Sequence, residues 1–186
     1  MNHFLCIFHS CQPKRYLMSF DDILKKAKTD ITTYGWSFMY VDTNQEQGIE
    51  SFSYTIGFEK TYNHPEIITF GLPAEPAHGI LSATAAAIKD GEKMPLHEPI
   101  ENILGGDLKV MFKPLDHNCY KDYLSVAIEA YQTTRFRTQV MLWPDKEGKF
   151  PTENEYSILV QRHALKVISA SEDFDISALE KDKHLH

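Results

Sequence analysis

The chain has 186 residues, which suits one ordinary globular domain and is too short for two. Hydrophobic residues make up 42% of the sequence and charged residues 24%, so the chain can bury a core without metal or disulfide support. The formal net charge is −7, from 26 acidic and 19 basic residues, which argues against the basic surface of a general nucleic-acid binder. The acidic balance favours a basic partner if the protein has one.

The cysteines and the N-terminal segment narrow the class of protein further. Cys6, Cys11 and Cys119 are odd in number and irregular in spacing, which indicates free thiols in a reducing compartment. No stretch approaches the roughly 20 apolar residues of a membrane span. Residues 1–18 lack the basic start of a signal peptide, so we expect them to be an N-terminal extension. The sequence therefore predicts a cytoplasmic protein without membrane contacts.

The first predicted elements are a helix and a strand. Residues 19–35 carry apolar side chains at helical spacing, with Ser19 as the N-terminal cap and Gly35 as the terminator. Residues 36–40 alternate aromatic and smaller side chains, which is typical of a strand. The polar segment 43–48 is expected to be the turn into a second strand.

The second predicted strand has two contrasting faces. One face carries Phe52, Tyr54, Ile56 and Phe58, and the other carries the small residues Ser53, Thr55 and Gly57. A row of small residues on a strand lets another group approach the backbone closely. A packed helix and a bound ligand both fit this pattern, and we favour the helix.

The rest of the chain alternates strands and helices. The expected elements are a loop at 59–65, a strand at 66–71, a helix at 78–91, an irregular connection at 92–106, a strand at 108–115, a helix at 119–134, a strand at 138–143, one or two strands at 157–169, and a polar tail at 171–186. Short connections between the early strands favour antiparallel pairing. We predict an α+β fold in a single domain over residues 19–170. Its sheet is mainly antiparallel, with about five to seven strands and about three packed helices.

A series of short motifs resembles a known family. The motifs are Tyr34-Gly35-Trp36, Tyr54-Thr55-Ile56-Gly57-Phe58, Pro65-Glu66, Phe70-Gly71-Leu72, Gly91, Gln139, and Trp143-Pro144-Asp145 followed by Gly148, Phe150 and Pro151. Over residues 20–162 the chain is similar to the bacterial family of domains of unknown function numbered 4262. That family often has a further tryptophan after the Phe-Pro pair, whereas Thr152 and Glu153 stand here. The resemblance implies a grouping and transfers no catalytic residue.

Two segments hold the candidate ligand or partner site. His64 and Glu66 flank Pro65, and a histidine near a carboxylate suits acid–base chemistry at neutral pH. Trp143 and Asp145 at the WPD turn suit the wall of a small-molecule pocket. If the two segments are adjacent, the site comprises Tyr54, Thr55, Gly57, His64, Glu66, Trp143 and Asp145. The structural alternatives are a solvated loop histidine, an edge-strand charge and an aromatic cover on the sheet.

Metal and thiol chemistry have weaker support. Histidine and cysteine pairs lie near the two termini or, as His117 and Cys119, around a turn that suits helix capping, so we predict no metal site. Cys119 would need His117 or His163 beside it to act as a nucleophile, and packing within a helix is the simpler interpretation. The chain has no P-loop, no G-x-G-x-x-G and no G-x-S-x-G motif.

Three functions stay open on the sequence. The first is an immunity-like binding module that is not an enzyme, acts as a monomer or homodimer, and engages a protein partner, basic in character, through its acidic surface. The second is a site for a small molecule or a cofactor, such as a flavin or nucleotide, in a cleft between the YTIG hairpin and the WPD turn, with an enzymatic role open. The third is that these motifs only build turns and core. We predict the first, without a bound cofactor, and keep the second as the alternative.

Overall fold

The computed structural model describes residues 18–42, 50–105, 108–171 and 173–174. Its six-stranded sheet has the order β1-β2-β3-β6-β5-β4. The strands are β1 (Ser37–Val41), β2 (Phe52–Ile56), β3 (Glu66–Phe70), β4 (Pro99–Ile100), β5 (Val110–Pro114) and β6 (Thr138–Leu142). The helices are α1 (Phe20–Tyr34), α2 (Phe58–Tyr62), α3 (Ala74–Lys89), α4 (Tyr120–Tyr123) and α5 (Ser125–Tyr131), with 3₁₀ segments η2 (His117–Cys119) and η3 (Leu159–Lys166).

The sheet consists of two antiparallel halves joined in parallel. β1, β2 and β3 pair antiparallel in chain order, and so do β4, β5 and β6. The two halves meet where β3 pairs with β6 in parallel, with Glu66 opposite Thr138. The predicted α+β class and the mainly antiparallel sheet are confirmed, whereas the parallel pair at the centre was not foreseen. It joins strands that are more than 60 residues apart in the chain, so no short-range signal points to it.

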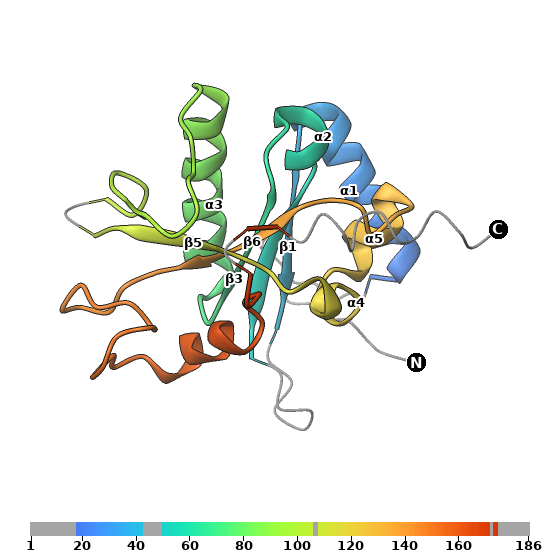
Figure 1. Cartoon of the computed structure of the whole chain (residues 1–186). Coiled ribbons are helices and arrows are strands. Elements are labelled where there is room, and N and C mark those ends of the chain that lie inside the picture. Colours follow the sequence, from blue (N-terminus) through green and yellow to red (C-terminus); the bar gives the residue numbers. More distant parts are fainter. Residues whose placement is uncertain (1–17, 43–49, 106–107, 172, 175–186) are drawn as a thin grey trace.

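Helices cover both faces of the sheet and create two cores. Figure 1 shows α3 on one side and α1, α4 and α5 on the other. On the α1 side, Ile23 and Ala27 pack with the aromatic face of β2. On the α3 side, Leu81 packs with Phe112 of β5 and with other apolar residues of the sheet. The small face of β2 lies on the side of α3, which contacts this strand, so the favoured packed-helix interpretation holds there.

Helix α1 begins and ends as the sequence predicts. The Ser19 hydroxyl oxygen accepts a hydrogen bond from the Asp22 N–H. It thereby provides a partner for one of the N–H groups that the first turn of a helix leaves unpaired. Gly35 ends the helix in the left-handed region at φ 88°, and its N–H donates to the Ile31 carbonyl. This ending leads the chain directly into Trp36 and β1.

Gly57 changes the expected path of the second strand. Its φ of 118° ends β2 at Ile56 and starts α2 at Phe58. Phe58 therefore packs in the α3-side core and not beside Phe52, and the loop predicted at 59–65 holds a short helix. A Cβ atom at Gly57 would lie 2.7 Å from the Gly35 carbonyl oxygen. The group that approaches this glycine is thus the backbone at the end of α1.

The strands predicted at 157–169 are wrong, because Leu159–Lys166 forms the 3₁₀ helix η3 and the described part of this segment adds only an isolated bridge of Ile168 with Leu115. Among the described side chains of this segment, Gln161, Ala164 and Val167 are buried at a spacing of three residues, which is the period of a 3₁₀ helix. Both edges of β6 are already paired, with β3 and β5, so η3 packs against the sheet instead of extending it.

Two further expectations differ in their boundaries. α3 starts at Ala74, one turn before the predicted start, because Pro73 precedes it in extended geometry. The helix predicted at 119–134 is divided into η2, α4 and α5, with the break at Leu124. The turn at 43–48, the extension at 1–17 and nearly all of the polar tail lie outside the described residues. No described helix is long and apolar enough to cross a bilayer.

Candidate functional site

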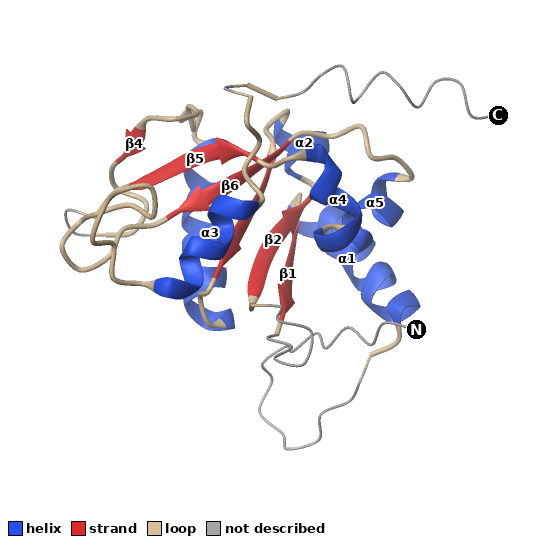
Figure 2. Ribbon diagram, turned by 60° about the horizontal axis from the view of Figure 1, so that its bottom comes forward, coloured by secondary structure: helices blue, strands red, loops and turns tan. Residues whose placement is uncertain are grey.

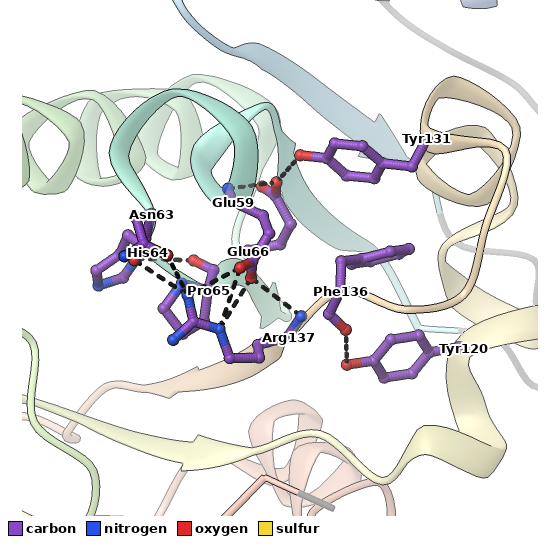
Figure 3. Close-up of polar contacts among 9 residues, drawn as sticks. All are labelled: Glu59, Asn63, His64, Pro65, Glu66, Tyr120, Tyr131, Phe136 and Arg137. Atoms are coloured by element: carbon purple, nitrogen blue, oxygen red, sulfur yellow. Dashed lines mark hydrogen bonds and ion pairs between the residues drawn. The ribbon is translucent and has the colours of Figure 1, made fainter. Parts of the chain in front are cut away.

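Glu66 is the buried carboxylate at the start of β3, with 0% of its surface exposed. Its Oε2 accepts a 2.6 Å hydrogen bond from the Thr55 hydroxyl. Its Oε1 accepts hydrogen bonds from the N–H groups of Gly57 at 2.9 Å and Glu59 at 3.1 Å. The Tyr131 hydroxyl, which reaches over from α5, also donates to Oε1 (Figure 3). Four donors from three elements therefore converge on one carboxyl group.

The hydroxyl partners of Glu66 fix the direction of these bonds. The Tyr131 oxygen accepts the Gly57 N–H at 2.8 Å, and the Thr55 oxygen accepts the Ile67 N–H at 2.9 Å. Each hydroxyl proton is thereby left to point at the carboxyl group, an arrangement that suits an ionised acceptor. Burial nevertheless raises the pKa of Glu66 above its usual value, and the hydrogen bonds counteract only part of that rise. Burial, together with the Glu66 charge, also raises the pKa of Tyr131.

The contacts of Glu66 join three elements of the fold. Gly57 is the N-cap residue of α2 and Glu59 lies in its first turn, so the carboxylate satisfies N–H groups that a helix start leaves without partners. The Thr55 hydroxyl takes the Ile67 N–H just beyond the last β2–β3 pair, Tyr54 with Ile68. Glu66 thus holds the end of β2, the start of α2 and the end of α5 together.

His64 does not form an acid–base pair with Glu66. Its Nδ1 lies 2.7 Å from the Pro65 carbonyl oxygen and donates to it, which leaves Nε2 without a proton. Nε2 is buried and has no hydrogen-bond partner, and the ring lies edge-on to Phe58. Burial lowers the pKa of His64, and the nearby Arg137 charge adds to the effect. The lowered pKa favours the neutral imidazole, and the ring points away from the Glu66 carboxyl group (Figure 3).

An ion pair that the sequence did not reveal fastens α2 to the start of β6. The Arg137 guanidinium contacts Glu59 through Nε at 3.0 Å and Nη2 at 2.8 Å, and the Arg137 N–H also donates to this carboxylate. Nη2 donates to the Asn63 carbonyl oxygen as well. Figure 3 shows this pair beside the bonds of Glu66. The Glu66 N–H donates in turn to the Arg137 carbonyl, so the two groups brace the same corner of the sheet.

Asp145 organises the WPD turn and the segment that follows it. The residue is only 2% exposed. Its Oδ1 accepts the N–H groups of Glu147 and Lys149, each at 3.0 Å, and its Oδ2 accepts both the N–H and the hydroxyl of Ser157. Burial opposes ionisation, but these hydrogen bonds outweigh it and lower the pKa of Asp145. Its carboxylate is occupied by its own loop.

The predicted cleft between the YTIG hairpin and the WPD turn does not form. Glu66 lies opposite Thr138 at the start of β6, whereas Trp143 follows the last residue of that strand. A strand rises about 3.3 Å per residue, so the two segments are roughly 16 Å apart at opposite ends of the sheet. The Trp143 indole N–H donates to the Phe70 carbonyl, and Tyr54 is buried in the α1-side core. Of the seven candidates, the structure brings Thr55, Gly57 and Glu66 into direct contact.

Cys119 is poorly suited to nucleophilic chemistry. Burial raises the pKa of its thiol, and the charges of Asp116 and Asp122 raise it further. The Nε2 atom of His163 is 2.8 Å from the Tyr123 hydroxyl. Among the described residues, no group of three His, Cys, Asp or Glu side chains is placed to hold a metal ion.

A hollow of about 500 Å³ lies across β1, and its lining contains none of the seven candidate residues, although Tyr62 of α2 contributes to it. Its lining comes from both faces of the sheet and includes Lys26 and Asp30 of α1, Trp36 and Phe38 at β1, and His78 and Ala86 of α3. Figure 2 shows β1 between α3 and α1. We call this hollow the β1 groove.

The β1 groove has an aromatic wall and a charged rim. The centroid of the His78 ring lies 6.2 Å from that of Trp36, and the two rings are nearly parallel, with an interplanar angle of 20°. The His78 and Phe38 ring centroids are 5.0 Å apart, and these two rings are nearly perpendicular, at 87°. Lys26 forms a 2.5 Å ion pair with Asp30, whose carboxylate also accepts the Ser37 hydroxyl at 2.9 Å. The alternation of Trp36 and Phe38 was visible in the sequence, but their proximity to His78 depends on how α3 packs.

The comparison with known families agrees with the motifs. The family model DUF4262, described as a domain of unknown function, matches residues 30–157. The chain belongs to this family. The predicted resemblance is thereby confirmed, and the matched range includes both Glu66 and Asp145 as well as most of the β1 groove. No curated protein and no solved structure gives a significant match.

Proposed function

We propose that this DUF4262 member is a protein-binding module that engages its partner at the β1 groove. The observation that carries the proposal is the position of the groove, which spans a sheet edge and is lined by two helices on opposite faces. Both carboxylates of the candidate site, Glu66 and Asp145, already accept hydrogen bonds from within the chain.

The side chains around the groove support a contact with a protein. Trp36 and Phe38 are half-buried, and Tyr34 at the rim is 71% exposed. Aromatic side chains are enriched in protein interfaces because they bury a large apolar area with few rotatable bonds. Interfaces are commonly built around such anchors, with a polar rim that excludes water. Lys26, Asp30 and Lys89 supply a polar rim here.

The test compares two exposed alanines of α3. Ala86 lines the groove and Ala83 does not, so Ala86→Tyr fills the groove while Ala83→Tyr makes the same chemical change elsewhere on the helix. Both changes have the same intrinsic helix penalty. The full chain is panned against a phage library of random linear peptides, and enriched peptides are titrated by fluorescence anisotropy.

We expect enriched peptides whose Kd rises about tenfold or more with Ala86→Tyr and stays unchanged with Ala83→Tyr. Circular dichroism and thermal melting of both variants establish that they are folded. If no peptide is enriched, or if the two variants bind the enriched peptides equally, the groove is not the binding surface and the proposal is wrong.

A further inference from the structure

We propose that the segment bound in the β1 groove is extended and acidic, and that it adds to β1 as a further strand of the sheet. This inference rests on the proposed function and specifies the chemistry of the partner. Three features of the molecule carry it: the state of the β1 edge, the walls on either side of it, and the charge of the groove.

β1 is an edge strand suited to accept another strand. Within the described part of the chain it pairs on one side only, with β2. All five residues of β1 are in register with β2, from Ser37 opposite Ile56 to Val41 opposite Phe52, so the strand contains no bulge. Its sequence, SFMYV, has no proline and no charged residue. Proteins usually protect exposed edges with such features, and an edge that lacks them is a template for a strand from another chain.

The walls of the groove match the side-chain alternation of an added strand. Phe38 faces α3, whereas Ser37 faces α1 and donates to Asp30 there. Successive side chains of a bound strand would likewise point alternately to the two helices. One set would meet the aromatic wall of Trp36, Phe38 and His78 on the α3 side. The other set would meet the polar residues of α1.

The charge of the groove is opposite in sign to that of the whole chain. Its lining holds two lysines, Lys26 and Lys89, and one acidic residue, Asp30, which gives a local charge of +1 in a chain of −7. Asp30 already pairs with Lys26, and Lys89 has no ion-pair partner among the described residues. A carboxylate on the bound segment would complement Lys89. The groove therefore favours an acidic segment, in place of the basic partner that net charge alone suggests.

The experiment uses the peptides enriched on the full chain, resynthesised with one backbone N-methyl group at each position in turn. In an added strand only every second N–H points at the neighbouring edge, so N-methylation should weaken binding about tenfold at alternate positions and little at those between. Lys89→Gln should weaken binding and reduce its salt dependence. Lys121→Gln, an exposed lysine on α4, is the matched control and should change neither.

Three other outcomes would contradict part of the proposal. If the peptides are sensitive to Ala86→Tyr but N-methylation shows no two-residue alternation, strand addition is wrong while the groove remains the binding surface. Enrichment of neutral or basic peptides, or binding that is unaffected by Lys89→Gln, would exclude an acidic segment. Analytical ultracentrifugation covers the remaining occupant: a dimer that Ala86→Tyr dissociates would mean that the groove binds a second copy of this chain.

Discussion

Replacement of Glu66 tests whether the buried carboxylate is a structural acceptor. In Glu66→Leu the Gly57 N–H keeps the Tyr131 oxygen as a partner, whereas the Glu59 N–H loses its acceptor. The hydroxyl protons of Thr55 and Tyr131 lose theirs too. An unsatisfied buried donor costs about 1–3 kcal/mol, and water can reach the half-buried Tyr131. Removal of a buried charge offsets part of the loss, so we expect Glu66→Leu to lower the free energy of unfolding by about 3 kcal/mol.

Glu66→Gln is the matched variant, because it keeps the shape and one carbonyl oxygen. That oxygen can accept the bonds now made to Oε1, and one N–H of the amide can donate to the Thr55 oxygen, which leaves the Thr55 proton and the second amide N–H in need of other partners. We expect a loss of about 1 kcal/mol, roughly 2 kcal/mol less than for leucine. Urea unfolding at pH 7, followed by tryptophan fluorescence, measures both values. Equal losses in the two variants would refute the role of the acceptor.

The pH dependence of the same pair gives an independent check. The folded-state pKa of Glu66 is raised, so the folded chain binds this proton more tightly than the unfolded chain does. The contribution of Glu66 to stability is therefore complete below its unfolded pKa and is lost as the pH rises through the folded value. Wild type should lose stability relative to Glu66→Gln as the pH rises from about 4 to 7. A relative gain over that interval would contradict the sign of the shift.

The remaining predictions concern the backbone and the two other polar groups. Gly57→Ala should lower the free energy of unfolding by more than about 2 kcal/mol, or prevent folding, because φ is 118° and the Cβ site is occupied. Gly79→Ala, in open space within α3, should raise it by about 0.5–1 kcal/mol, and chemical denaturation of the pair distinguishes backbone strain from loss of glycine alone. A double-mutant cycle between Arg137→Gln and Glu59→Gln should give a coupling of about 1 kcal/mol, since the pair is partly exposed, and a coupling near zero would count against it. Asp145→Ala should speed limited proteolysis of residues 146–157, and an unchanged cleavage rate would show that its hydrogen bonds do not hold the loop.

The parts of the fold that were predictable are those fixed by neighbours in the chain. The cap and terminator of α1 and the period-two pattern of β2 are local signals, and both led to the observed elements. The η3 segment carried a local signal too, in the three-residue spacing of Gln161, Ala164 and Val167, but its β-branched residues favoured strands. A further strand could have paired with β6 only if one edge of β6 were free, and that depends on how all the strands of the sheet are ordered.

The candidate site was harder to predict because its partners are distant in the chain. Glu66 next to Pro65 suits an edge-strand charge, whereas in the structure it accepts a hydrogen bond from Tyr131, which is 65 residues away. The prediction that Trp143 and Asp145 share a site with it assumes that the two segments are adjacent. The parallel pairing of β3 with β6 places Glu66 and Trp143 at opposite ends of the sheet. The sequence of neither strand by itself indicates that the two strands pair.

The positions of the polar groups and of the groove imply that stability and binding are separable in this molecule. Glu66 and Asp145 direct their carboxylates inward and fasten elements together, so substitutions there should change unfolding and reach the β1 groove only through loss of structure. Ala86 is exposed, and surface changes of this kind usually alter stability by less than about 0.5 kcal/mol. A variant that loses peptide affinity at full stability should therefore map to the groove. A variant that loses both together should map to the buried hydrogen bonds.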